Sequence, residues 1–246
     1  MNHNRISRAV FFAAVLAASR GSAAESTNLK VQRVDPFSKL SAYVALRAAE
    51  FGEIPSERKS KLQELAQYVA DRKSAGEIVK LTFICTHNSR RSQMAQLWAA
   101  VAAAHYGIDR VETNSGGTEA TAFNPRAVAA LERAGFEIVK ADESATSADP
   151  ENPRYRVSFT GCGNPLVCFS KKYDSIPNSN ADFCAVMTCS DADKNCPVVP
   201  GAAFRLSLPY VDPKVSDGTP AEAATYDDRS AQIAREMLYV FSRVKN

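Results

Sequence analysis

One segment constrains this chain more than any other, the Cys-x5-Arg-Ser run from Cys85 to Ser92. It follows an apolar, β-branched run over 78–84 that predicts a buried strand, and it precedes a helical pattern over 92–106. A loop of this length can curl so that successive backbone N–H groups point inward and form a nest for an anion. The helix adds its free N–H groups and its positive dipole end. The segment therefore predicts an oxyanion site.

The residue types in this loop suit a nucleophile and its anion. Cys85 lies at the bottom of the predicted cup, where the same dipoles favour its thiolate. Arg91 begins the helix, and its guanidinium can bind two oxygens of a tetrahedral anion. Ser92 can donate a hydrogen bond to the thiolate, and Asn88 tolerates left-handed backbone angles. The other positions of the predicted anion site are Thr86, His87, Ser89 and Arg90. The alternative is a buried cysteine at a strand end, followed by a charged helix start.

Strand and helix patterns alternate from residue 76 to the end. Further apolar strands are predicted at 111–114, 183–188 and 204–208. This alternation predicts an α/β fold, a three-layer sandwich with a central, mostly parallel sheet and helices on both faces. Residues 76–246 form the predicted main domain, and residues 25–75 an N-terminal helical extension. Residues 142–182, rich in Asp, Ser, Asn and Pro, are interpreted as an insertion that contains a hairpin.

Residues 1–24 have the features of an export signal. Two arginines precede an apolar run over 9–18, and the small residues Ser22 and Ala24 fit a peptidase site, so cleavage after Ala24 is expected. The run is shorter than the roughly 20 apolar residues that span a bilayer. An uncleaved membrane anchor and an ordinary first helix are the alternatives. The sequence predicts an exported, periplasmic protein with no membrane segment once the signal is removed.

Composition narrows the class of partner. The chain is 45% hydrophobic and 23% charged, as is typical of soluble globular proteins. Residues 1–24 hold three of the 30 basic residues and none of the 27 acidic ones, so the remainder is formally neutral. No basic stripe points to nucleic acid. Affinity for anions is therefore expected to come from a local site.

Cysteines occur at five further positions: Cys162, Cys168, Cys184, Cys189 and Cys196. Cys162 and Cys168 flank a short Gly-Asn-Pro turn and are predicted to form a disulfide, which an oxidising compartment would preserve. Cys184 lies in an apolar strand and is expected in the core. With three histidines and no second closely spaced ligand pair, the sequence predicts neither a metal site nor a cofactor.

The run from Cys85 to Ala95, Cys-Thr-x-Asn-Ser-x-Arg-Ser-Gln-Met-Ala, resembles the low-molecular-weight protein tyrosine phosphatase superfamily. Within that superfamily it looks most similar to the thioredoxin-coupled arsenate reductases. The Ser-Gly-Gly-Thr segment at 115–118 also resembles the end of the superfamily's second strand. The resemblance covers residues 78–139 and 183–243, and it supports the predicted sandwich fold.

The resemblance implies roles for three residues outside the loop. Asp212, in an Asp-Pro pair, would be the general acid that protonates a leaving oxygen, although Asp-Pro is also common in ordinary turns. Cys189 and Cys196 match a cysteine pair of the arsenate reductases, in which the first thiol attacks the arsenic adduct and the second resolves the disulfide. A structural disulfide between them is the alternative.

Residues near Asp212 bear on the substrate. Phosphotyrosine-specific members of the superfamily carry aromatic residues just after this Asp-Pro to hold the ring. Lys214 and Val215 stand there instead, which leaves Tyr210 to serve from the other side. The side chains of His87 and Arg90 either tune the choice of substrate or point to solvent.

Three functions are consistent with these features. The first is an arsenate-reductase-like enzyme, in which Cys85 attacks a phosphate- or arsenate-like oxyanion and the Cys189–Cys196 pair passes electrons from a thioredoxin-like reductant. The second is a phosphatase that acts on phosphotyrosine or a small phosphomonoester with the same loop. The third is an exported oxyanion-binding protein without turnover. Binding alone would require neither the nucleophile Cys85 nor the acid Asp212, which argues against the third.

Overall fold

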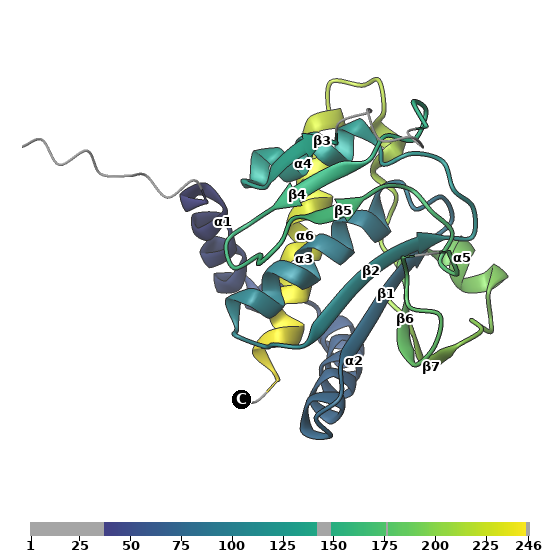
Figure 1. Cartoon of the computed structure of the whole chain (residues 1–246). Coiled ribbons are helices and arrows are strands. Elements are labelled where there is room, and N and C mark those ends of the chain that lie inside the picture. The colour runs from purple at the N-terminus through teal and green to yellow at the C-terminus, as the bar shows by residue number, and fades with distance from the viewer. Residues whose placement is uncertain (1–36, 142–148, 176, 245–246) are drawn as a thin grey trace, which may run out of the picture. The chain divides into compact units, whose positions relative to one another are not determined.

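Four parallel strands form the centre of the fold in a computed structural model that describes residues 37–141, 149–175 and 177–244. Their order across the sheet is β2-β1-β6-β7 (Figure 1). These strands are β1 (Val79–Cys85), β2 (Val111–Gly117), β6 (Phe183–Met187) and β7 (Ala202–Ser207). Every residue of β6 is buried, as expected for a parallel strand covered on both faces. The predicted export signal at 1–24 lies outside the described residues.

Five helices share one hydrophobic core with this sheet. They are α1 (Ser38–Ala49), α2 (Ser56–Ser74), α3 (Arg91–His105), α4 (Pro125–Ala134) and α6 (Glu222–Ser242). Their buried side chains form a single cluster with Val79, Leu81 and Phe83, which alternate along β1 and so point to the same face. The fully buried Trp98 of α3 lies at the centre of this layer, where its ring stacks on Tyr43 of α1 at 5.3 Å.

The opposite face of the sheet carries a thinner layer. Ile84 and Met187 point to this side and pack against Ala192 of α5 (Ser190–Asn195) and against Val199. The predicted α/β sandwich with a central parallel sheet is confirmed. Among the helices of the described residues, α5 alone contributes to this second cluster, so the two outer layers differ greatly in thickness.

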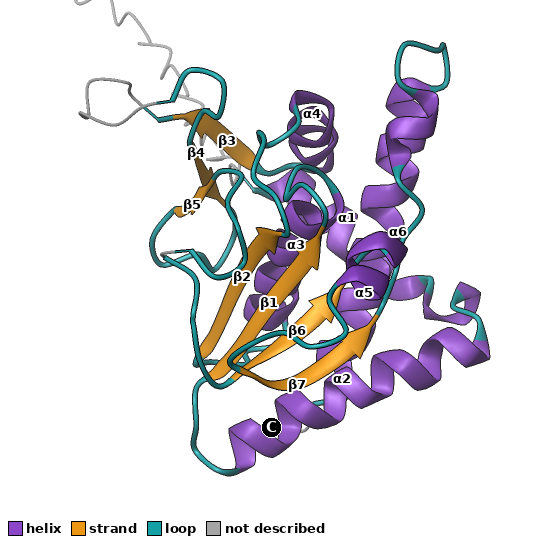
Figure 2. Cartoon of the chain, turned by 90° about the vertical axis from the view of Figure 1, so that its right-hand side faces the viewer, coloured by secondary structure: helices purple, strands orange, loops and turns teal. Residues whose placement is uncertain are grey.

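A separate antiparallel sheet accompanies the parallel one (Figure 2). Its order is β3-β4-β5, comprising β3 (Glu137–Lys140), β4 (Tyr155–Ser158) and β5 (Leu166–Cys168). The hairpin that the sequence predicts within 142–182 corresponds to β4 and β5. Residues 142–148 and 176 of this insertion lie outside the described residues.

The predicted disulfide between Cys162 and Cys168 is wrong, because both residues are free thiols. Cys168 ends β5 with its side chain in the hydrophobic core, where burial raises the pKa of its thiol to about 12. Cys162 instead donates a hydrogen bond to the carbonyl oxygen of Asn164, at 2.7 Å. Cys184 is buried in β6, in agreement with the sequence.

The described part of the N-terminal extension is integral to the core. After α1, a short 3-10 helix, η1 (Phe51–Glu53), leads into α2. The buried residues of α2 recur at helical spacing: Leu62, Leu65, Ala66 and Val69. Arg58 binds Oε2 of Glu236 in α6 through two nitrogens, at 2.8 and 3.0 Å, although Glu236 is only 2% exposed. Within the described residues, no helix has both the length and the apolar character needed to cross a bilayer.

Replacement of Leu65 by Ala tests the packing of α2. Leu65 is fully buried, so Leu65→Ala should lower the free energy of unfolding by roughly 2–5 kcal/mol, measured by urea denaturation. Leu46→Ala is the matched control, because Leu46 on α1 is 54% exposed and should change stability by less than about 0.5 kcal/mol. Equal, small losses in the two variants would contradict the packing of α2 on the core.

Candidate active site

Cys85 lies at the bottom of a loop between β1, which it ends, and α3, which begins at Arg91. The residue is 3% exposed. Its carbonyl accepts the N–H of Thr118 at 3.2 Å, which joins the loop to the end of β2. Gly117 permits this close approach, because a Cβ atom there would lie 2.6 Å from the carbonyl oxygen of Thr86. The Ser-Gly-Gly-Thr segment therefore supports the loop directly.

Ser92 connects the nucleophile to the loop. Its Oγ lies 3.1 Å from Sγ of Cys85 and 2.9 Å from Nδ2 of Asn88. The Asn88 amide nitrogen can only donate, so Ser92 accepts that bond and its own hydrogen is free for the sulfur. The hydroxyl of Ser92 therefore faces the sulfur of Cys85 as a hydrogen-bond donor, the role that the sequence predicts for it.

Asn88 holds the loop in shape from several sides. Its backbone adopts a left-handed φ of 47°, as the loop requires. Its side-chain oxygen accepts the backbone N–H of Lys171 at 3.0 Å and the amide of Gln93 at 3.2 Å. The Gln93 amide also donates to the carbonyl of Phe169, at 2.9 Å. The segment after β5 thus forms the back of the loop, a contact that no local pattern of the sequence indicates.

The carbonyl groups of the loop are bonded to surrounding protein donors, whereas its backbone N–H groups are not bonded to protein acceptors in the described part of the chain. The carbonyl of Thr86 accepts the N–H of Glu119 at 2.8 Å, and that of Ser89 accepts the N–H of Asn124 at 2.9 Å. The His87 carbonyl binds the hydroxyl of Ser170, at 2.8 Å. Within the described residues, no protein acceptor receives the backbone N–H groups of residues 86–92. A row of unpaired N–H groups at the start of a helix is suited to bind an oxyanion.

Arg91 and Asp212 meet at the edge of the loop. Nη2 of Arg91 lies 2.7 Å from Oδ2 of Asp212, and Nη1 donates to the carbonyl of Tyr210 at 3.1 Å. The other carboxyl oxygen of Asp212 accepts the N–H of Lys214 and so caps the 3-10 helix η2 (Pro213–Ser216). The structure therefore brings Asp212, predicted to be the acid, to the guanidinium predicted to bind the anion.

Cys189 lies next to the same loop. Its sulfur is 3.5 Å from the hydroxyl of Thr86 and accepts the N–H of Ala192 at 3.3 Å, at the start of α5. Cys85 and Cys189 are buried in one hydrophobic cluster, and the partly exposed Cys196 packs against it. All three are free thiols, so the pair at 189 and 196 is not a disulfide in this structure.

Three further side chains had a predicted place in or beside the loop, and two of them, Arg90 and Tyr210, differ from the expectation. His87 is exposed, which agrees with the second of its two alternatives, and its Nε2 lies 3.6 Å from Glu119. The Arg90 side chain is instead held inside the protein, where Nε donates to the hydroxyl of Tyr226 at 2.8 Å. Tyr210 is 4% exposed and cannot hold a substrate ring, because its side chain lies in the core.

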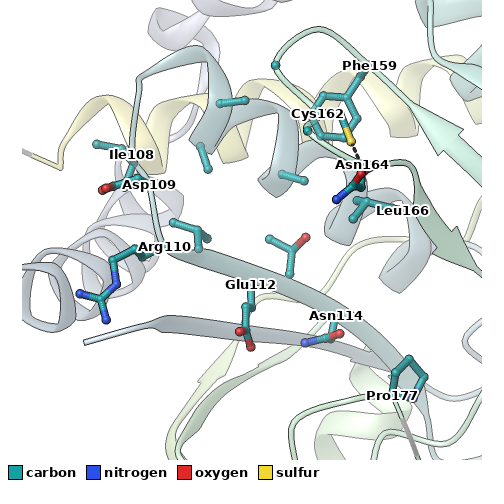
Figure 3. A pocket seen from close by; sticks show the side chains of 17 residues that line it. Ile108, Asp109, Arg110, Glu112, Asn114, Phe159, Cys162, Asn164, Leu166 and Pro177 are labelled. Carbon is teal, nitrogen blue, oxygen red and sulfur yellow. Dashed lines mark hydrogen bonds between the residues drawn. The ribbon is translucent and has the colours of Figure 1, made fainter. Parts of the chain in front are cut away.

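A separate hollow of the described structure lies away from this loop. It encloses about 630 Å³ between β2, the end of α3 and the turn before β5 (Figure 3). Glu112, Phe159 and Cys162 line it, whereas none of the predicted site residues does. This hollow lies at the C-terminal end of α3, away from the helix N-terminus that follows Cys85, so we place the proposed chemistry at the Cys85 loop. No group of three or more His, Cys, Asp or Glu residues suited to a metal ion occurs in the described residues.

Comparisons with known proteins found one family and several relatives. Residues 80–152 match the model of a family described as low molecular weight phosphotyrosine protein phosphatase. A protein named arsenate reductase from Shouchella clausii is 31% identical over 140 residues, which cover 57% of this chain and 78% of that protein. One from Staphylococcus aureus strain Newman is 35% identical over 131 residues, covering 53% and 76%.

Among solved structures, a low molecular weight phosphotyrosine phosphatase from Vibrio cholerae O395 is similar, with a TM-score of 0.43 and 14% identity. The similarity covers 67% of this chain and 95% of that chain.

Ser92→Ala tests the hydrogen bond to the nucleophile. Hydrogen bonds to charged groups contribute about 1.5–3 kcal/mol, so alkylation of Cys85 by iodoacetamide at neutral pH should slow by roughly tenfold or more. Peptide mass spectrometry measures this rate at Cys85 alone. Ser230→Ala is the control, because Ser230 is equally buried and accepts a bond from Trp98 away from the loop. An unchanged alkylation rate in Ser92→Ala would exclude the bond.

Proposed function

Because this chain belongs to the low molecular weight phosphotyrosine protein phosphatase family, in which it has arsenate reductases as relatives, we propose that it is an arsenate reductase with Cys85 as nucleophile. The loop amides and Arg91 would bind the tetrahedral oxyanion, and Asp212 would supply a proton to the departing oxygen. A dithiol protein of the thioredoxin type would be the reductant.

The position of Cys189 carries this proposal. Its sulfur lies 3.5 Å from the hydroxyl of Thr86, the residue next to the nucleophile, in the cluster that also contains Cys85. Hydrolysis of a phosphoester requires one thiolate and one acid, and it gives no role to a second buried thiol here. Transfer of two electrons to arsenate requires a second thiol, and Cys189 is a thiol of this chain beside the loop.

The first step joins arsenic to Cys85. The Cys85 thiolate attacks the arsenic(V) atom and forms an S–As bond, while one oxygen leaves as water with the proton from Asp212. The free N–H groups of residues 86–92 face the negative charge of the anion throughout this step. Arg91 adds two further donors if the anion displaces the Asp212 carboxylate from its guanidinium.

The second step reduces the arsenic. The Cys189 thiolate attacks the sulfur of Cys85, an S–S bond forms, and the electron pair of the broken S–As bond stays on arsenic, which leaves as arsenite. Cys196 then attacks Cys189 and releases Cys85 as a thiolate. The external dithiol reduces the resulting bond between Cys189 and Cys196. Since Cys189 and Cys196 lie at the two ends of α5, this exchange requires the helix to rearrange.

A phosphatase is the second candidate, because Cys85, Arg91 and Asp212 by themselves suffice for phosphoryl transfer. The surroundings of Asp212 favour a small substrate over phosphotyrosine. Val211 and Val215 are 64% and 76% exposed, and Tyr210 is buried, so no aromatic side chain from this segment can stack on a substrate ring.

Serine variants of the cysteine pair separate the two functions. Cys189→Ser and Cys196→Ser should each stop arsenate turnover with a thioredoxin system, yet leave hydrolysis of an aryl phosphate within roughly threefold of the wild type. Cys85→Ser should abolish both activities, because a hydroxyl lacks the nucleophilicity of a thiolate. Cys162→Ser is the matched control, since this thiol lies in a separate hollow, and it should retain both.

Trapped intermediates distinguish the two thiols further. Cys196→Ser should accumulate a disulfide between Cys85 and Cys189 after one turnover, visible in non-reducing peptide maps. Cys189→Ser should retain the arsenic adduct on Cys85. A reductant-resistant bond between Cys189 and Cys196 in fully active enzyme would rule out the relay and favour the phosphatase.

We also infer that the protein is exported to the periplasm, on the basis of the charged, apolar and small-residue regions of 1–24. In a bacterial host with an export system, the mature protein should begin at Glu25. N-terminal sequencing of the periplasmic fraction measures this directly. Recovery of the intact chain from Met1 in the cytosol would contradict export.

A further inference from the structure

Two adjacent arginines at the end of the loop hold the two ends of η2. Arg91 pairs with Asp212, just before this short helix, at 2.7 Å. Arg90 pairs with Asp217, just after it, with Nη2 and Oδ2 3.6 Å apart. The segment that carries the acid is therefore attached to the anion loop at both ends.

Tyr226 of α6 completes the second attachment. Its side chain is fully buried, and its hydroxyl accepts Nε–H of Arg90 at 2.8 Å and donates to Oδ1 of Asp217 at 2.8 Å. Burial raises the pKa of Tyr226 to about 12, so the phenol keeps its proton and remains a donor to Asp217 near neutral pH. The three side chains form a closed ring of contacts between the loop, η2 and α6.

We propose that Tyr226 is a positioning residue, which keeps Asp212 over the oxyanion loop by fixing Asp217 to Arg90. This inference rests on the proposed function, in which Asp212 protonates the departing oxygen. A general acid must lie within hydrogen-bond reach of that oxygen, and small displacements cost much of the rate. The four residues of η2 form a short connection between Asp212 and Asp217, so a shift of Asp217 moves the acid as well.

Other contacts of this segment are weaker candidates for the same role. Arg126 pairs with Glu222 at 2.7 Å and reaches Asp217 only at 3.8 Å. Its side chain is 39% exposed, and ion pairs in contact with solvent restrain little. Tyr226 is the member of the network that is both buried and bonded to the loop and to the acid segment.

The test compares two aryl phosphates in the full chain. Phenyl phosphate needs a proton on its leaving oxygen, whereas p-nitrophenyl phosphate leaves readily without one. Tyr226→Phe should lower kcat for phenyl phosphate by roughly tenfold or more and kcat for p-nitrophenyl phosphate by less than about threefold. Tyr239→Phe is the matched control, because Tyr239 lies on the same helix, is 2% exposed, and bonds Gln63 instead of the loop. It should change neither rate.

A second comparison asks whether the effect passes through the acid. In an Asp212→Asn background, Tyr226→Phe should cause no further change in the ratio of the two rates, because the group that it positions is already lost. Asp217→Asn should reproduce the selective loss on phenyl phosphate with Tyr226 intact, and it decides the question if Tyr226→Phe does not fold. Equal losses on both substrates, or an undiminished loss beside Asp212→Asn, would overturn the proposal.

The outcomes also separate this inference from the proposed function. A wild-type chain that hydrolyses aryl phosphates but does not reduce arsenate would refute the reductase, and the rate ratio would still decide the role of Tyr226. A chain that reduces arsenate, with the same ratio in Tyr226→Phe as in the wild type, would refute the positioning role alone. In a wild-type chain inactive on both aryl phosphates, the rate of arsenate reduction would decide instead, and an unchanged rate in Asp212→Asn would overturn acid catalysis by Asp212 and, with it, the positioning role.

Discussion

The side chain of Asn88 holds the oxyanion loop together. It donates to Ser92, which faces the nucleophile, and accepts from the backbone of Lys171 behind the loop. Because its bonds fix a left-handed turn in the middle of the loop, the neighbouring carbonyls face outward to protein donors and the amides stay free. The proposed anion site thus depends on satisfied carbonyls as much as on a positive helix end.

Local patterns of the sequence predicted the elements that build the site. The apolar run before Cys85 became β1, and the helix expected from Ser92 is α3, one residue earlier. Both assignments depend on the local spacing of apolar residues. Burial against the sheet requires that spacing, so a short stretch of sequence is enough to show it. The residues from Cys85 to Arg91 are contiguous in the sequence, so the loop that they form between the strand and the helix was predictable as well.

Contacts between distant residues were beyond such patterns. Lys171 reaches Asn88 across 83 positions, and Tyr226 reaches Arg90 across 136. The prediction of a disulfide between Cys162 and Cys168, which depended on sequence spacing alone, was wrong. Cys162 and Cys168 are close in sequence, but the hairpin turns one side chain into the core and the other toward a carbonyl. Side-chain direction is a property of the folded strand, and a pair of positions in a sequence does not determine it.

The contact between Arg58 and Glu236 extends the site into the N-terminal extension. The guanidinium of Arg58 lies 4.7 Å from the ring of Tyr210, whose carbonyl holds Arg91. A shortened chain that began at residue 76 would retain every residue of the loop, yet it would leave the carboxylate of Glu236 buried without its cation and uncover one side of Tyr210. A helix upstream of the residues that match the family model therefore supports the carbonyl that holds Arg91.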